Sequence, residues 1–256
     1  MLIAVGKFTG TGAAQSITIA DVDGGGAFLP KLGWLISNNG HIIYKQDTFA
    51  ATESIQWRNI AVQTTGITAF NSDGFSVGTD VEFNGLGDIT YYVMLGTDDD
   101  LLETGSYTGN GVDDRIISTV QGWELGFVLV KRFSGSAQAA VCHFGTPQTG
   151  SVAPTGAGNQ DNISALDSIQ QISTGQFQVG TNISVNQNTF AYHWFAFREV
   201  AGLVAGANYV VTSQFSGSGA DDQTILYNGV DAIQARFLMI RHLTDTTGLL
   251  RAVVKT

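Results

Sequence analysis

Ser76 is the residue whose surroundings most resemble a catalytic motif. It stands in Gly74-Phe75-Ser76-Val77-Gly78, which matches the G-x-S-x-G pattern that presents a nucleophilic serine in many hydrolases. That pattern needs a helix after the serine, whereas residues 79–83 have the composition of a strand. A similar stretch later in the chain has Gln178 in place of the serine. We therefore expect no catalytic serine here.

The histidines and the cysteine are spaced unlike the ligands of a metal site. The chain has four histidines, three of which flank or lie in apolar stretches, and one cysteine, Cys142, in an apolar run. No H-x-x-x-H or C-x-x-C pair occurs, so zinc has no support. We expect structural histidines, a buried Cys142, no disulfide and no cofactor. The histidines are His41, His143, His193 and His242.

Two features remain as candidate binding residues. Asp98, Asp99 and Asp100 form an acidic run followed by Glu103. Calcium prefers several oxygen ligands at loop spacing, although turn chemistry and surface solvation also account for such a run. Trp57 lies on a long connection and has no counterpart later in the chain, so it could be an exposed ring that stacks on a sugar.

The elements that must position these residues recur along the chain. Phe8-Thr9-Gly10-Thr11-Gly12 returns as Tyr107 to Gly111 and as Phe215 to Gly219, each time before an alternating stretch and two apolar runs. Gly74-Phe75-Ser76-Val77-Gly78-Thr79 returns as Gln176 to Thr181. The apolar runs align Trp34 with Phe127 and Phe237, which assigns Trp34 to the core, and Trp194 lies in a repeated aromatic strand.

These segments are short, alternating or β-branched, and they end at Gly, Asn, Asp or Ser, which is typical of strands and turns. We predict an all-β protein of jelly-roll-like β-sandwich repeats, with two full copies and a C-terminal half copy. The expected divisions are residues 1–100, 101–199 and 200–256. Residues 52–62 are the best helical candidate, and 146–164 read as an exposed loop.

The half copy predicts assembly. Its few strands would bury little apolar surface alone and would leave open edges, so they must pack on the other repeats or on a neighbouring subunit. We expect a homo-oligomer, for which a trimer is one plausible form.

Charge and hydropathy exclude several classes of protein. The 256 residues contain 22 acidic and 12 basic side chains, a net charge of −10, which disfavours a nucleic-acid partner. No apolar run approaches the ~20 residues that span a bilayer, and the N-terminus does not resemble a signal peptide, so we expect no membrane partner.

A resemblance to a known family rests on four stretches. They are Tyr107 to Gly111, Leu125 to Lys131, Phe70 to Gly78 and the aromatic strand Thr90 to Leu95. Together they resemble a β-rich repeat domain of tailed-bacteriophage virion proteins, some of them tail-fibre-like, which has no assigned enzymatic activity. Segment 146–164 departs from the pattern, and the chain has no separate trimerisation region of the kind long tail fibres carry.

The resemblance implies a non-enzymatic virion protein, made in the host cytoplasm. The short chain favours a decoration or cement protein on the head surface, with the major capsid protein as its neighbour. The alternative is a tail-fibre-type adhesin that binds a host glycan or protein through Trp57 and the long loops. A secreted carbohydrate-active enzyme is disfavoured, because no pair of carboxylates is kept in both repeats.

Overall fold

The computed structural model describes residues 3–19, 28–96, 101–144 and 167–199, and the backbone of the strands β16 (Phe237–Ile240) and β17 (Arg251–Val254). Strands in antiparallel sheets make up most of these residues, and the two helices have four residues each. The prediction of an all-β protein is confirmed. Strands β16 and β17 pair with each other within the expected half copy.

The first half of the chain is a sandwich of two antiparallel sheets. One sheet has the order β1-β8-β3-β4-β5 and the other the order β2-β7-β6. The first strand thus pairs with the last, and the second with the last but one. The elements are β1 (Ile3–Thr9), β2 (Gln15–Thr18), β3 (Pro30–Ile36), β4 (Ile42–Gln46), β5 (Ile55–Gln56), β6 (Ile67–Asn71), β7 (Gly74–Val77), α1 (Val81–Asn84) and β8 (Ile89–Gly96).

The second half is built in the same way. Its sheets have the orders β9-β15-β11-β12 and β10-β14-β13, so only β5 lacks a counterpart among the described residues. The elements are β9 (Leu102–Thr108), β10 (Arg115–Ser118), β11 (Leu125–Arg132), β12 (Val141–Phe144), β13 (Ile169–Ser173), β14 (Gln176–Val179), α2 (Ile183–Asn186) and β15 (Ala191–Arg198).

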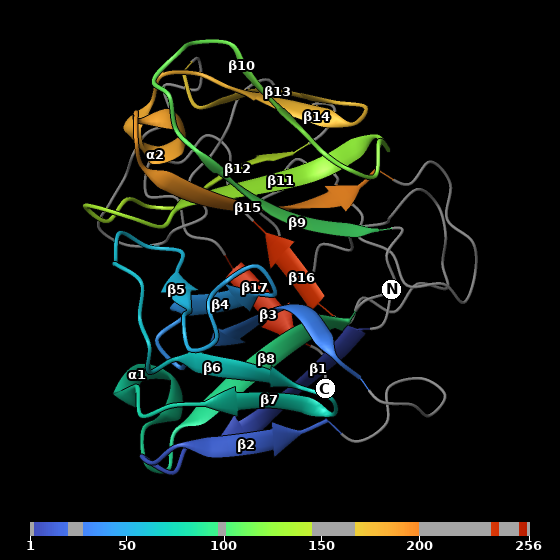
Figure 1. The fold of residues 1–256 in the computed structure, drawn as a ribbon. Coiled ribbons are helices and arrows are strands. Elements are labelled where there is room, and N and C mark those ends of the chain that lie inside the picture. Colours follow the sequence, from blue (N-terminus) through green and yellow to red (C-terminus); the bar gives the residue numbers. More distant parts are fainter. Residues whose placement is uncertain are drawn as a thin grey trace, which may run out of the picture.

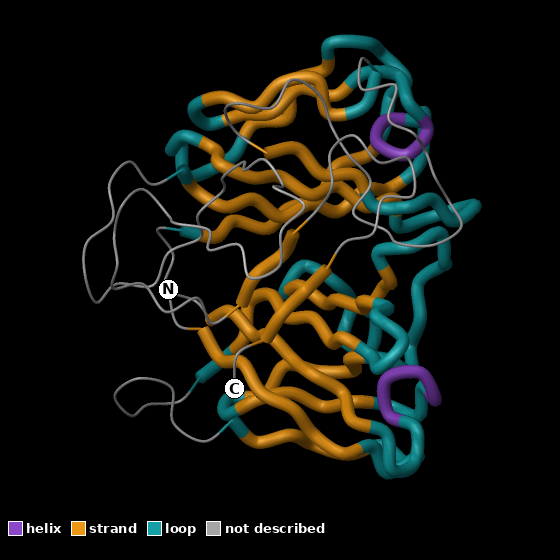
Figure 2. The backbone as a smooth tube through the Cα atoms, turned by 180° about the vertical axis from the view of Figure 1, so that it is seen from behind, coloured by secondary structure: helices purple, strands orange, loops and turns teal. Residues whose placement is uncertain are grey.

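The two sandwiches stack as four layers, with the larger sheets inside and the three-stranded sheets outside (Figure 1). The inner sheets share a middle core, in which Trp34 and Tyr44 of the first half meet Phe195 of the second. Two further cores lie between each inner sheet and its outer sheet. Because both faces of an inner sheet are covered, every residue of β4 and β11 is buried. The short helices lie on one side of the stack, as Figure 2 shows from behind.

The pairing register corrects one detail of the repeat alignment. Trp34 lies opposite Val93, and Leu129 lies opposite Phe195, the residue of β15 that is equivalent to Val93. Trp34 therefore corresponds to Leu129 and not to Phe127. A shift of two residues keeps every side chain on the same face of a strand, which is why the assignment of Trp34 to the core is still right.

The glycines of the repeated motif have two different roles. The first, Gly10 or Gly109, passes so close to the chain after the short helix that a Cβ would lie 2.1 Å from a backbone carbonyl oxygen. The second, Gly12 or Gly111, has a φ of +71° or +68°, a conformation that favours glycine. Both conditions hold in each half, which explains why the spacing of the motif recurs.

In each half, the side chain of a buried asparagine forms hydrogen bonds to this turn. The Oδ1 atom of Asn84 accepts the backbone N–H of Thr11 at 3.0 Å and the side-chain amide of Gln15 at 2.7 Å. Its Nδ2 atom donates to the carbonyls of Ala13 and Gly78 at 2.7 and 2.6 Å. One side chain thus ties the β1–β2 turn, the end of β7 and the helix together.

Asn186 has the equivalent role in the second half. Its Oδ1 atom accepts the backbone N–H of Asn110 at 3.0 Å, and its Nδ2 atom donates to the Val112 carbonyl at 2.7 Å. Asn84 is 1% exposed and Asn186 is fully buried. We call this arrangement the asparagine clamp.

In both edge strands, β1 and β9, a glycine packs against an aromatic side chain of the neighbouring strand. Gly6 of β1 lies opposite Tyr92, and Gly105 of β9 lies opposite Trp194. A Cβ on Gly105 would lie 2.4 Å from the Trp194 ring, and a Cβ on Gly6 would lie 2.4 Å from the Tyr92 hydroxyl. In each half the large aromatic side chain covers the backbone of a glycine on the neighbouring strand.

Two predictions of local structure are wrong. The sequence favours a strand over residues 79–83, but Asp80 caps α1 by accepting the N–H of Glu82 at 2.9 Å. The sequence favours a helix over residues 52–62, but they contain the short strand β5 and turns. Contacts with distant segments override the local pattern, because β5 pairs with β4 in the inner sheet and Asn84 ties α1 to the β1–β2 turn. The predicted loop 146–164 and residues 200–236 of the expected half copy lie outside the described residues.

Replacing Asn84 by alanine should lower the free energy of unfolding by about 2 to 4 kcal/mol, because buried donors and acceptors would lose their partners. Urea denaturation measures this. The matched control is Asn38→Ala, an exposed position at which we expect a change of about 0.5 kcal/mol or less. Equal effects of the two substitutions would show that the clamp does not stabilise the fold.

Replacing Gly105 by alanine should cost about 1 to 3 kcal/mol, since the added methyl group overlaps the buried Trp194 ring. Urea denaturation followed by tryptophan fluorescence reports both the loss and the movement of the ring. Ser106→Ala, at the next and exposed position of β9, is the control. An unchanged midpoint for Gly105→Ala would contradict the close packing of this strand pair.

Candidate functional site

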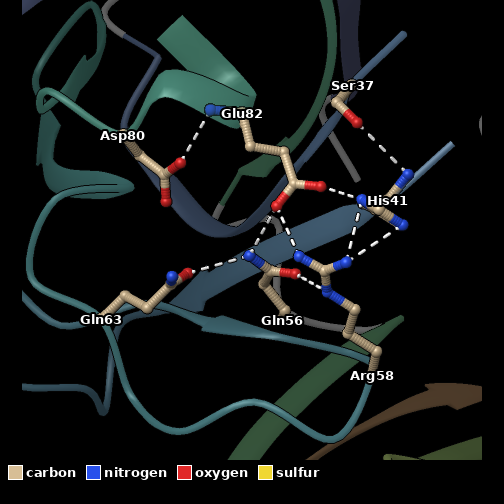
Figure 3. A network of polar contacts seen from close by, with 7 residues as sticks. All are labelled: Ser37, His41, Gln56, Arg58, Gln63, Asp80 and Glu82. Atoms are coloured by element: carbon tan, nitrogen blue, oxygen red, sulfur yellow. Dashed lines mark hydrogen bonds and ion pairs between the residues drawn. The ribbon is translucent and has the colours of Figure 1, made fainter. Parts of the chain in front are cut away.

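The most concentrated group of polar side chains in the described residues lies beside α1 (Figure 3). The guanidinium of Arg58 donates through Nη2 to Oε2 of Glu82 at 2.6 Å, and its Nη1 lies 3.1 Å from both ring nitrogens of His41. The other Glu82 oxygen contacts Nδ1 of His41. Gln56 donates to Glu82 at 3.1 Å and accepts from Nε of Arg58. We call these four residues the charge cluster.

Four different segments position the charge cluster. His41 ends the hairpin between β3 and β4, where its N–H faces Ser37 Oγ at 3.3 Å. Gln56 belongs to β5, and Arg58 follows in the connection to β6. Glu82 lies in the first turn of α1. The cluster therefore fastens three connections of the first half to one another.

Burial is the main electrostatic effect in the charge cluster. It lowers the pKa of His41, and the positive charge of Arg58 lowers that pKa further. Burial raises the pKa of the neighbouring Asp80, and Arg58 opposes that rise. His41 is therefore neutral at pH 7, and the ion pair of Arg58 with Glu82 holds the cluster together. The contacts of the cluster hold these loops in place.

Among the described residues, the second half has no equivalent of the charge cluster, and Ser184 takes the position of Glu82. The sequence pattern singles out His41 but not its partners Arg58 and Glu82. The three residues come from separate stretches of the chain with no common spacing. No sequence signal available from one chain could have joined them.

Trp57 does not lie on the surface as expected. Its side chain is 2% exposed and packs against Trp34 with a ring-centroid distance of 6.2 Å. Its backbone carbonyl accepts the N–H of Ala140 at 2.7 Å, which joins the two halves. The expectation of a ring that stacks on a sugar is wrong, because Trp57 belongs to the middle core.

The other candidate residues have structural surroundings or lie outside the described part. Ser76 Oγ lies 3.1 Å from Ser16 Oγ and accepts from the Asn71 side chain, with no histidine in that group. Cys142 is buried, as expected. Asp98, Asp99 and Asp100 are outside the described residues. Among the residues that are described, no group of three or more His, Cys, Asp or Glu side chains could hold a metal ion.

Two of the described histidines are enclosed by other side chains. His193 lies between Phe49 and Phe133, with ring-centroid distances of 4.8 and 4.3 Å, and its Nδ1 is 3.2 Å from Thr48 Oγ1. Burial lowers the pKa of His193 to about 4 and also lowers the pKa of His143. Both are neutral at pH 7 and serve as packing residues.

Buried lysines are a feature that the sequence pattern does not reveal. Lys131 of β11 is fully buried, and its Nζ donates to the carbonyl of Arg58, in the other half, at 2.9 Å and to the carbonyl of Gln138. Burial lowers its pKa to about 7. Lys45 of β4 donates to two loop carbonyls at 2.8 Å, and burial lowers its pKa to about 8. Lys131 thus joins the sandwiches by a polar contact at the edge of the middle core.

Lys131 should make the stability depend on pH. Between pH 7 and about 10 the unfolded lysine binds a proton that the folded one has released, so stability should rise with pH by about 1.4 kcal/mol per unit from this group. Urea denaturation from pH 7.5 to 9.5 measures the slope. Lys131→Met should remove this contribution from the slope, while exposed Lys7→Met should leave the slope unchanged. The same slope in wild type and Lys131→Met would contradict the lowered pKa.

Comparisons with protein-family models, with curated proteins and with solved structures each find no match to this chain. Among the residues that the structure describes, no helix is both long and apolar enough to cross a membrane.

Proposed function

We propose that this protein is a non-enzymatic structural component of a bacteriophage particle, a decoration or cement protein on the head surface. The sequence resemblance suggests the particle, and one structural observation supports the role. The outward faces of the two outer sheets carry no charged side chain, although the chain as a whole has a net charge of −10.

The first outer face presents small side chains. In β2, β7 and β6, the side chains of Ile17, Phe75 and Phe70 lie in one row and pack inward. The alternate positions therefore point outward. These are Ser16, Thr18, Ala69, Asn71 and Ser76, of which Ser16 and Thr18 are exposed.

The second outer face also presents uncharged side chains at the equivalent positions, and four of them are longer than their counterparts. Arg115 is the only charged residue in the six strands of the two outer sheets. Its guanidinium donates to the Thr108 carbonyl and to Asn186 Oδ1, and it covers the ring of Tyr107 at 5.1 Å, so it belongs to the clamp. The outward positions are Ile116, Ser118, Gln171, Ser173, Gln176 and Gln178.

Surfaces of soluble proteins usually carry charges at about a quarter to a third of their positions. Two faces without charge at opposite ends of an acidic molecule are the places where an acidic neighbour can approach with least repulsion. Small side chains on one face and longer ones on the other suit a heterologous, head-to-tail contact. The proposed neighbours are further copies of this chain and the major capsid protein.

We extend the proposal to the fold. The pairing of the first strand with the last, and of the second with the last but one, is shared with jelly rolls, whereas the β3–β4 and β6–β7 hairpins within single sheets depart from them. Each half is then one jelly-roll-like copy, and β16 and β17 belong to a half copy that packs on the other repeats or on a neighbouring subunit. A tail adhesin remains the alternative, but the burial of Trp57 removes the contact residue on which it was based.

A charge on an outer face should weaken assembly. We expect Gln178→Glu and Ser76→Glu each to reduce binding to heads that lack the protein by about tenfold, the size of one unfavourable charge contact at an interface. Co-sedimentation with purified heads measures binding, and light scattering measures self-association. Ser106→Glu adds the same charge on the exposed edge strand β9 and is the control.

Mass spectrometry of separated heads and tails tests the location independently. The protein should be found in the head fraction. Its presence only in tails would overturn the head assignment, and undiminished binding of Gln178→Glu would overturn the role of the outer faces.

A further inference from the structure

The described residues contain three Asn-Gly steps, Asn39-Gly40, Asn84-Gly85 and Asn110-Gly111. Such a step can modify itself, because glycine has no side chain to keep its backbone nitrogen away from the preceding side-chain amide. Whether it reacts in the folded protein depends on the freedom of both groups. The structure places the three steps in very different surroundings.

Asn84 is held at every polar atom of its side chain. It is 1% exposed, and its amide makes the four hydrogen bonds of the asparagine clamp. Its Cγ atom can meet the nitrogen of Gly85 only if the β1–β2 turn and the helix separate. This step is therefore protected for as long as the first half stays folded.

Asn110 is exposed but is tied to the second clamp. Its N–H donates to Asn186 Oδ1 at 3.0 Å, and its own Oδ1 accepts the N–H of Val112 at 3.0 Å. The N–H of Gly111 donates to the Asn186 carbonyl at 2.8 Å. The last two of these hydrogen bonds hold the reacting groups and must break before the Gly111 nitrogen can reach Cγ of Asn110.

Asn39 is the least restrained of the three. It lies in the exposed three-residue loop 38–40 of the β3–β4 hairpin, and its side chain has no hydrogen-bond partner among the described residues. Gly40 has a φ of +75°, and a Cβ added to it would meet no atom within 4 Å. One exposed hydrogen bond, from Gly40 N–H to the Ser37 carbonyl at 2.9 Å, holds the attacking nitrogen.

We propose that Asn39-Gly40 is a site of spontaneous modification in the folded protein, at which Asn39 becomes aspartate or isoaspartate. The Gly40 nitrogen attacks Cγ of Asn39, the Cγ–Nδ2 bond breaks, and ammonia leaves with the proton from the glycine nitrogen. The resulting succinimide ring takes up one water molecule and opens at either carbonyl. No oxidant, reductant or enzyme is required.

The modification would reach the charge cluster. Isoaspartate adds one carbon to the main chain within a loop closed by Ser37 N–H to His41 O at 3.0 Å. The next residue after the Asn-Gly step is His41, which contacts Arg58 and Glu82. A longer loop moves His41 out of the cluster and loosens the connections that the cluster fastens. Conversion of Asn39 accumulates with time, so the local structure around α1 would change as the protein ages.

The test is peptide mass spectrometry of the whole protein after incubation at mildly alkaline pH, which promotes attack by the glycine nitrogen. Asn39 should be converted at least about tenfold faster than Asn84 and Asn110, because only its reaction needs no opening of a clamp. The two other steps are internal controls in the same sample. In urea-unfolded protein the three rates should become similar.

The second readout is the titration of His41 followed by NMR. In the converted fraction, the pKa of His41 should move back toward the ordinary histidine value, because its burial and its contact with Arg58 are lost. Asn39→Gln, whose longer side chain closes a ring much more slowly, should keep the original titration after the same incubation. Conversion of Asn84 or Asn110 as fast as Asn39 in folded protein, or no conversion at Asn39 when the unfolded chain reacts, would overturn the proposal.

Discussion

The structure depends on one constraint, which is that the two inner sheets are apolar on both faces and must be covered on both. Alternate residues of β3 show this directly. Trp34 enters the middle core, whereas Leu35 enters the core toward the first outer sheet. A sheet of this kind cannot be the outermost layer of a molecule, because the apolar side chains of one face would be exposed to water. Stacking the two sandwiches through their inner sheets satisfies the constraint for both at once.

This stacking also explains the unusual position of several polar groups. Lys131 and Trp57 lie where the two halves meet, and each forms a hydrogen bond across the junction, through the Lys131 Nζ atom and the Trp57 carbonyl. Lys45 lies on the opposite face of its sheet, which Ile43 presents to the first outer sheet, and it ties down the loop after β4. A buried polar group without a partner is costly, and both lysines are tolerated here because each Nζ atom donates to carbonyl oxygens. The hydrogen bonds of Lys131 and Trp57 add directional contacts to the interface between the two halves, whose apolar packing is not directional.

The polar side chains of the described residues therefore divide into groups with different roles. The asparagine clamps fix the turns within each half, and the charge cluster fixes three connections of the first half. The outward residues of the outer sheets carry no charge and belong neither to the clamps nor to the charge cluster. The proposed function in assembly relies on these two faces.

The sequence by itself determined the strands, the turns and their recurrence. Period-two patterns report which residues share a face, and the glycines at 10, 12, 109 and 111 reflect local backbone requirements, so both are visible along the chain. Only the tertiary structure decided that Trp57 is buried, that residues 81–84 form a helix, and that His41, Arg58 and Glu82 meet. The physical reason is that each of these depends on contacts between segments far apart in sequence, above all on the packing of one inner sheet against the other, and no local pattern records which surface will cover a given side chain.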